Sequence, residues 1–343
     1  MTLQLTNRER LIGILDLVAP GMEAREVVEQ SSCFVFDGSR VMTFNDELFC
    51  HMPLPDDLML EGAVAGKKLL ESLRKYPDED IKLEVKPEAL IVKAKGRTTK
   101  VNREAEIKLP VNDVEKVPDD AWVTCTDDFL AGLKLVVGCC STQKDAMFGA
   151  RCVHVTPDHL EACDNYQLSR YLAKTDLGGR ALLKSEWVPH ILNLGANEMA
   201  MTEAWVHFRN ATGLNVACRR YVEDFMDIEK VLVVENTQAI ALPPGLTEAL
   251  DRCMIFSNEN SENNRVRVRL KPGKMELHGE GHSGTHTERR QINYDGPAID
   301  FYVAPDLLAS IVDRHKEAEI NEERIVFDSD VFRYVACLIP SDK

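Results

Sequence analysis

Three histidines recur every four residues near the C-terminal end of the chain, at His278, His282 and His286. On a helix this spacing would place the three imidazoles on one face, where they could bind a metal ion. The intervening glycines disfavour a helix, and no cysteine or carboxylate stands at a standard metal-ligand spacing. We therefore expect no metal site. An enzyme that acts on nucleic acid through this segment is the least favoured function.

The same segment, Gly279-Glu280-Gly281-His282-Ser283-Gly284, matches the G-x-G-x-x-G pattern of dinucleotide-binding loops. In those folds the pattern opens a helix, whereas here it leads into residues 291–294, which are typical of a strand. We therefore predict a flexible hairpin loop. The chain has neither a G-x-S-x-G elbow nor a P-loop. Its acidic runs at 56–57 and 78–80 are interpreted as solvated loops. The sequence favours a protein that is not an enzyme and needs no cofactor.

The composition narrows the class of protein. The chain has 343 residues, 44% of them hydrophobic, enough for two or three domains with their own cores. Its formal net charge of −15 argues against ordinary nucleic-acid binding, unless basic residues are segregated on one surface or the protein encloses DNA. Ten cysteines, scattered apart from Cys139-Cys140, are typical of reduced thiols. Without a signal peptide or an apolar run of about 20 residues, we expect a cytoplasmic protein with no membrane partner.

Four patterns recur in the same order, which indicates a repeated domain. Each copy opens with an amphipathic helix, expected at residues 11–18, 130–137 and 246–253. A strand, a turn and a second strand follow, marked by apolar pairs five residues apart: Phe36/Val41, Val155/Leu160 and Leu270/Met275. A second helix is expected at 69–73, 187–191 and 307–311. Two strand-like runs close each copy, at 81–92, 205–218 and 325–339.

This order predicts an α+β fold of three tandem domains, each with two helices on one face of a curved antiparallel sheet. Boundaries are expected near Val117-Pro118 and near Asn236-Thr237, because both follow strand-like runs. The predicted domains are therefore residues 1–117, 118–236 and 237–343.

The repeated segments resemble the bacterial and phage-type DNA polymerase III β subunit, the replicative sliding clamp. Phe36-Asp37-Gly38 with Val41–Asp46 is similar to the hairpin of its first domain, and residues 160–168 to a segment of its second. Ile255-Phe256-Ser257-Asn258-Glu259 resembles a run in its third domain, and residues 334–340 resemble its closing strand. The resemblance covers the whole chain and rests on the order and spacing of short motifs.

The resemblance implies a non-catalytic processivity factor. Two chains would pair head to tail into a closed ring, each forming half of it, with helices lining the hole and sheets forming the outer wall. The ring would encircle double-stranded DNA without sequence preference and tether a replicative DNA polymerase. A clamp loader would be a further partner, and the setting would be the nucleoid of a bacterium or a viral genome in a bacterial host. The alternative is a clamp-fold scaffold or decoy that binds clamp partners without encircling DNA.

Sequence-independent contact with DNA needs cations along the hole. The candidates on or beside the expected helices are Arg8, Arg10, Lys67, Lys68, Arg74, Lys75, Lys134, Lys184, Arg252 and Arg314. Arg25 and Gln143 fall in loops that resemble DNA-contacting loops of the family. The alternative is that these side chains belong to ordinary solvated helix faces.

A pocket for a short apolar peptide of partner proteins is also implied. Its residues would be Met147, Cys163, Asn165, Tyr166, Leu168, Met226, Lys230, Val231, Cys337, Ile339 and Pro340. Asn165, Tyr166 and Met226 depart from the family pattern, which affects partner specificity. The alternative is that Met147, Leu168 and Ile339 are core residues.

Ring closure would pair edge strands of neighbouring subunits. Ile255 and Phe256 match the apolar contact of the family on one side. On the other side Lys100, Val101 and Asn102 form the edge, which lacks large apolar residues. We expect a weaker or more electrostatic interface than in better-known members.

Overall fold

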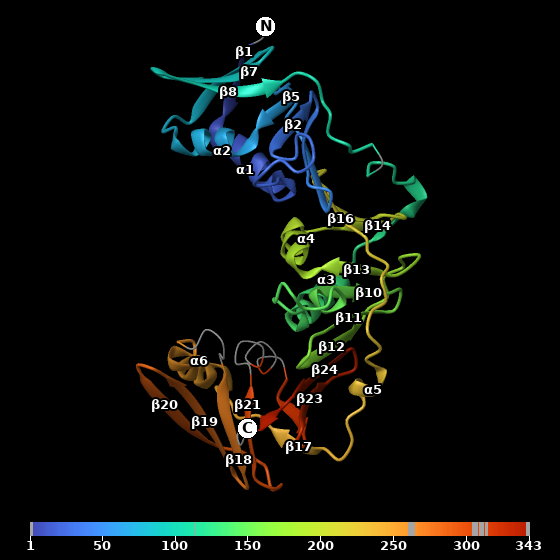
Figure 1. Ribbon diagram of the computed structural model, residues 1–343, viewed down its shortest axis with the longest axis vertical. Helices are drawn as coiled ribbons and strands as arrows, with labels where there is room; N and C mark the ends of the chain where they lie inside the picture. The colour runs from blue at the N-terminus through green and yellow to red at the C-terminus, as the bar shows by residue number, and fades with distance from the viewer. Residues whose placement is uncertain are drawn as a thin grey trace. The chain divides into compact units, whose positions relative to one another are not determined.

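A computed structural model describes residues 3–112, 114–259, 265–303, 308, 312 and 315–340. The chain divides into two compact units (Figure 1). Unit 1 comprises Met1–Leu130, Val155–Asp158 and Lys174–Glu223, and unit 2 comprises Ala131–His154, His159–Ala173 and Asp224–Lys343. Among the described residues, no helix is both long and apolar enough to cross a lipid bilayer.

Strands and helices alternate along the chain in one repeated order. The first set is β1 (Leu3–Asn7), α1 (Arg8–Val18), β2 (Cys33–Asp37), β3 (Arg40–Phe44), β4 (Leu48–Pro53), β5 (Glu61–Ala65), α2 (Gly66–Lys75), β6 (Asp80–Lys86), β7 (Ala89–Ala94) and β8 (Arg97–Glu104). The second is β9 (Trp122–Thr124), α3 (Asp127–Val136), β10 (Cys152–Val155), β11 (His159–Cys163), β12 (Gln167–Leu172), β13 (Ala181–Lys184), α4 (Val188–Leu194), β14 (Glu198–Met201), β15 (Trp205–Arg209) and β16 (Asn215–Arg219).

A short helix, α5 (Glu229–Leu232), precedes the third set. That set is β17 (Gln238–Ala241), α6 (Leu246–Ser257), β18 (Val266–Lys271), β19 (Lys274–Gly281), β20 (Gly284–Gln291), β21 (Ile299–Val303), β22 (Glu317–Ile320), β23 (Arg324–Asp328), β24 (Phe332–Cys337) and β25 (Ile339–Pro340). The helix expected at 307–311 lies largely outside the described residues. In this part of the chain the structure describes Leu308 and Val312, and both are helical.

The order of strands within the sheets repeats three times. The runs β1-β6-β7-β8, β9-β14-β15-β16 and β17-β22-β23-β24 have the same connectivity, and so do β2-β3-β4, β10-β11-β12 and β18-β19-β20. This repetition agrees with three tandem copies, while the boundaries at 117/118 and 236/237 stay predictions. Each copy is an antiparallel α+β arrangement, as the sequence pattern predicted.

Local sequence explains the first helix. The Asn7 side chain accepts a hydrogen bond from the backbone N–H of Arg10 at 3.0 Å and so caps the N-terminus. Leu11, Leu15 and Val18 lie at helical spacing and are buried against the sheet. The predicted first helix is therefore confirmed.

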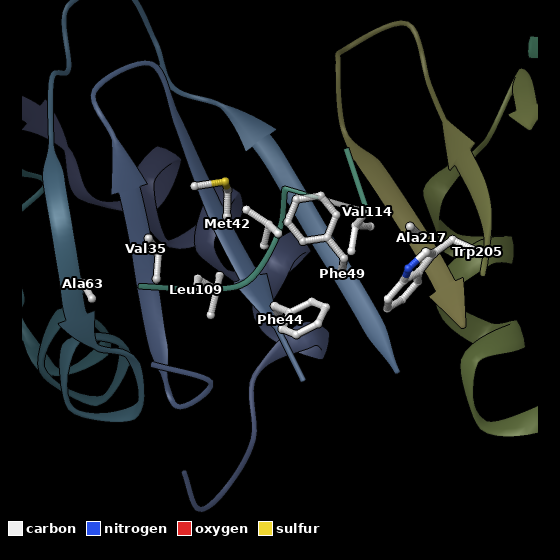
Figure 2. Packing of buried hydrophobic residues seen from close by; sticks show 10 residues of the cluster. Val35, Met42, Phe44, Phe49, Ala63, Leu109, Val114, Trp205 and Ala217 are labelled. Atoms are coloured by element: carbon white, nitrogen blue, oxygen red, sulfur yellow. The ribbon is translucent and has the colours of Figure 1, made fainter. Parts of the chain in front are cut away.

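Strands β3 and β4 of unit 1 are buried on both faces. Thr43 donates a hydrogen bond to the carbonyl oxygen of Val18, so this side of β3 faces α1. On the opposite side, Met42, Phe44 and Phe49 pack against a segment that follows β8 and contributes Leu109, Val111 and Val114 (Figure 2). Strands covered on both faces need continuous apolar runs, which accounts for the burial of residues 41–45 and 48–50.

Sheet continuity joins the first repeat to the second inside unit 1. Strand β4 pairs antiparallel with β16, so that Cys50 lies opposite Val216 and Phe49 opposite Ala217. Trp205 of β15 belongs to the same apolar cluster as Phe44 and Phe49, and its ring centroid lies 5.9 Å from that of Phe44. The junction is therefore a shared sheet with a shared core.

In unit 2 the strand pair β12·β24 makes the equivalent junction. Gln167–Tyr171 pair in register with residues 336 down to 332. The neighbouring strands of this unit follow the order β10-β11-β12-β24-β23-β22-β17. A second sheet of five strands, β20-β19-β18-β21-β25, has α6 packed on it (Figure 1).

The glycine-rich segment 279–284 is not a flexible loop. Residues up to Gly281 belong to β19 and those from Gly284 to β20, so only His282 and Ser283 form the turn. The strand expected at 291–294 begins seven residues earlier than predicted, at Gly284, and ends at Gln291. The glycines lie beneath α6, and a Cβ at Gly279 would come within 2.1 Å of the carbonyl oxygen of Cys253. Glycine is required here because the helix backbone approaches the strand closely, and not because the segment binds a phosphate.

Replacing Gly279 by alanine should lower the free energy of unfolding by about 1–3 kcal/mol, because the new methyl group overlaps rigid helix backbone. Chemical denaturation followed by circular dichroism measures the change. Gly178→Ala is the matched control, since a Cβ there meets nothing within 4 Å. Equal stability of the two variants would contradict the close packing of α6 on β19.

Candidate functional site

The helices differ in the charge that they offer to a ligand. Helix α2 carries Lys67, Lys68, Arg74 and Lys75 against the single carboxylate of Glu71. By contrast, α3 begins with Asp127 and Asp128, and α6 carries Glu248 and Asp251 beside Arg252. Among the described helices, positive charge is therefore concentrated on α2.

Several candidate cations are exposed and available. In the described part of the chain, Arg25, Lys67, Lys75 and Lys134 are exposed and form no ion pair. Arg10 is also exposed, with only a long contact of 3.9 Å to Asp57. Gln143 is exposed in its loop.

Two cations of α2 are engaged at the surface. Lys68 pairs with Glu71 at 3.1 Å and Arg74 pairs with Asp16 at 2.6 Å. These pairs are solvent-exposed, so they stabilise the fold little.

Three other candidates have structural partners. Arg8 is largely buried and donates to the carbonyl oxygens of Asp78 at 2.9 Å and Leu73 at 3.3 Å. Lys184 has a side chain only 13% exposed, which pairs with Glu47. Arg252 makes a bidentate pair with Glu288, at 2.9 and 3.0 Å. Arg314 lies outside the described residues.

The described residues among those expected to form a peptide pocket lie in several places. Cys163 and Leu168 are buried in an apolar cluster with Val335, and Met226 and Val231 pack against it. Leu168 is thus a core residue, as the alternative reading held, whereas Met147 is 73% exposed. Lys230 lines a separate groove of about 830 Å³.

A small hollow of about 170 Å³ lies in unit 2, lined by residues of β12 and β24 that alternate with those of this cluster. Tyr166 and Cys337 line it, together with Gln167, Tyr334 and Tyr302, which the sequence did not suggest. Tyr334 donates a hydrogen bond to the side-chain oxygen of Gln167 at 3.2 Å. The hollow thus combines aromatic walls with polar groups, a combination suited to holding a short peptide.

A turn positions the exposed residues of this hollow. The Asp164 carboxylate accepts hydrogen bonds from the backbone N–H groups of Tyr166 at 2.7 Å and Gln167 at 2.9 Å. Burial nevertheless raises the pKa of Asp164. Asn165 is exposed at the tip. Ile339 and Pro340 continue the backbone as β25, which pairs with β21, and their side chains lie outside the described residues.

Several strand edges are open within the described residues, among them those of β8 and β20. Strand β8 pairs with β7 over its whole middle but with β5 only at Arg103 and Glu104. Strand β20 ends its sheet and pairs only with β19. Each edge therefore presents unpaired backbone groups, which are a template for another strand.

The residues expected at these edges are only partly exposed. Lys100 and Asn102 are exposed on β8, whereas the Val101 side chain points into the core. Ile255 near the end of α6 is 66% exposed, while Phe256 is partly buried over Gly284 of β20.

Comparison with known proteins identifies the fold. No protein-family model matches the chain, and no curated protein matches it in sequence. Solved structures match over nearly the whole chain. They include a DnaN sliding clamp from Pseudomonas aeruginosa (16% identity, TM-score 0.77, covering 98% of this chain and 99% of that one). A beta sliding clamp of C. crescentus matches with 16% identity and a TM-score of 0.80, at 98% and 99% coverage. DNA polymerase III beta subunit of Thermotoga maritima matches with 15% identity and a TM-score of 0.75, at the same coverages.

The chain therefore has a ring-clamp type of α+β fold. More particularly, its fold is that of the DNA polymerase III beta subunit sliding clamps, so the resemblance seen in the sequence is confirmed at the level of fold. Full coverage of clamp chains of similar length fits three tandem domains.

Lys184→Ala should lower the free energy of unfolding by about 1–3 kcal/mol, because it removes the ion pair of the half-buried Glu47 carboxylate and leaves it only the hydroxyl of Tyr221, at 3.1 Å. Lys75→Ala, at an exposed unpaired cation, should change stability by less than about 0.5 kcal/mol. Urea denaturation measures both. If the Lys184 variant were as stable as the Lys75 variant, the Lys184–Glu47 pair would not be structural, and Lys184 would count among the cations available to a ligand.

Proposed function

We propose that this protein is a DNA sliding clamp: a non-catalytic ring that encircles duplex DNA and tethers a replicative polymerase. The observation that carries the proposal is the pattern of strand pairing between repeats. The third strand of the β2-β3-β4 run pairs with the last strand of the next repeat, as β4·β16, and β12·β24 repeats this rule. The rule leaves β20 of the third repeat with one unpaired edge, and β8 of the first with an edge that is paired only at Arg103 and Glu104.

A second copy of the chain would supply a partner strand for each of these two open edges. Strand β20 of one chain would pair with β8 of another, and the same contact repeated head to tail closes a two-fold ring. Ile255 would lie beside this seam as its apolar contact, and Lys100 and Asn102 would give the opposite edge a polar character. Self-association is thus part of the proposal.

The exposed cations suit DNA held inside such a ring. Arg10, Lys67 and Lys75 lie on α1 and α2, Arg25 and Gln143 on loops, and Lys134 on α3. Contacts through mobile, solvated cations are independent of sequence and easily exchanged, so the ring can slide. The excess of acidic residues would then discourage DNA from binding elsewhere.

Partner proteins would dock beside the β12·β24 junction. Tyr166, Gln167 and Cys337 line the small hollow there. Met147, earlier in the chain, is exposed. An apolar peptide of a polymerase or a clamp loader is the proposed occupant. The protein would work on bacterial or viral DNA in the cytoplasm. A scaffold that binds partners without encircling DNA is less favoured, because two complementary open edges suit ring closure.

Topological linkage is testable without a loader. The protein is incubated with linear duplex DNA biotinylated at both ends, and streptavidin is then added to block the ends. We expect protein to stay on the DNA in about 1 M salt, where ionic contacts are screened, and to leave when the duplex is cut by a restriction enzyme. Equal retention with open ends, or loss with blocked ends, would contradict encirclement. Lys67→Glu with Lys75→Glu should slow threading at low salt without abolishing retention.

Ring closure has a test of its own. At about 10 µM, sedimentation equilibrium should give twice the chain mass of 38.6 kDa. Ile255→Asp should shift the equilibrium towards the single chain by at least about tenfold, because it places a charge in the seam. Met59→Asp, at a residue 63% exposed in unit 1, is the control. A wild-type protein that remains a single chain would argue against the ring.

A further inference from the structure

The outer side of the β11-β12-β24 sheet in unit 2 carries three rows of side chains. Alternate residues of a strand point to the same face, and the registers align Cys163 with Leu168 and Val335 in the first row. The second row is Glu161, Arg170 and Arg333. The third begins with His159 and Leu172 and ends at Val331, whose carbonyl oxygen accepts the Leu172 N–H at 2.7 Å.

The segment that contains α5 covers the first two rows. Ile228 and Leu232 bury the apolar first row. Over the second row, Arg170 pairs with Glu229 at 2.6 Å, and Arg333 donates to the carbonyl oxygen of Leu232 at 2.9 Å. Figure 1 shows α5 beside β24, where the contacts place it. The cover ends there, and Leu172 and Val331 of the third row are left exposed.

Leu172 and Val331 line a groove of about 500 Å³ together with Val233, which stands just after α5. Leu172 is 50% exposed, Val331 is 40% exposed and Val233 is 63% exposed. Three branched aliphatic side chains converging on one concavity are characteristic of a binding surface, since singly exposed apolar residues are ordinary.

The charge at the rim is negative on its solvent side. In the pair Arg170–Glu229 the guanidinium is 17% exposed and the carboxylate 67%, and in the pair Arg333–Asp328 the values are 32% and 47%. Arg170 is held down by the buried Glu161, to which it donates at 2.8 Å. Asp330 is exposed and has no ion pair among the described residues. A ligand entering the groove therefore meets carboxylates first.

The rim is also fixed in place. Ser329 closes the turn between β23 and β24, because its hydroxyl accepts the Phe332 N–H at 3.2 Å and its own N–H donates to the Phe332 carbonyl oxygen at 2.8 Å. Val331 and Asp330 stand within this turn. A rigid rim lowers the entropy lost on binding.

We propose that this groove docks a linear segment of a partner protein, in which aliphatic side chains are flanked by lysine or arginine. The aliphatic groups would continue the cover that α5 begins, against Leu172, Val233 and Val331. The basic groups would meet Glu229, Asp328 and Asp330. The site lies at the opposite end of β12 from Tyr166 and does not depend on the proposed encirclement of DNA.

Two fluorescein-labelled synthetic peptides test the proposal on the full chain by fluorescence anisotropy: Lys-Leu-Ile-Leu-Lys and its acidic counterpart Glu-Leu-Ile-Leu-Glu. We expect saturable binding of the basic peptide at least about tenfold tighter than that of the acidic one. Val331→Asp should weaken binding of the basic peptide at least about tenfold. Asp330→Lys should weaken it about threefold or more, with a smaller loss at 0.5 M salt.

Matched controls separate this groove from the rest of the surface. Val27→Asp, at a residue 82% exposed in unit 1, and Tyr166→Asp, at the other hollow, should leave binding of the basic peptide unchanged. All variants alter exposed side chains, and circular dichroism verifies their fold. Equal affinity for both peptides, no saturable binding, or a loss only with Tyr166→Asp would overturn the proposal. It would also fail if Val331→Asp, and not Ile255→Asp, abolished self-association, since a second copy would then be the occupant.

Discussion

A β-strand at the end of a sheet leaves one row of backbone N–H and C=O groups without protein partners. In this chain, a strand at the end of one repeat pairs with a strand at the end of the next. The registers of β4·β16 and β12·β24 show the result, in which the sheet runs on from one repeat to another. Side chains then follow: Trp205 joins the core of Phe44 and Phe49, and Val335 joins that of Cys163 and Leu168.

The same constraint decides what lies over the sheets. The strands paired at each junction carry apolar side chains on both faces, so a helix on one side is not enough. Leu109, Val111 and Val114 cover the other side in unit 1, and residues of α5 and beside it cover it in unit 2. These connecting segments are therefore part of the core.

Much of this arrangement was predictable, since helices and strands follow local periodicity. The apolar pairs around the turns at Gly38 and Gly273 fixed two hairpins, and both glycines adopt positive φ, as tight turns require. The role of Gly279 was not predictable, because it depends on a helix more than twenty residues away in sequence. Nor could the sequence separate Lys184, paired with Glu47, from Lys75, since ion pairing across 137 residues is a tertiary property. The peptide-pocket residues were assigned by resemblance, and the structure divides them between core, hollow and groove.

Of the ten cysteine thiols, all in the described part of the chain, only that of Cys337 is exposed to solvent. Eight are buried, and Cys33 is partly so; burial raises the pKa of Cys163 to about 12 and that of Cys253 to about 11, which suppresses the nucleophilic thiolate. Cys337 is exposed, on the wall that it shares with Tyr166. An electrophilic dye would thus attach at one position without any engineered substitution, and its emission would register whatever enters that hollow. For the same reason, the Cys337 thiol in this hollow is the first group that an oxidant or alkylating drug would modify.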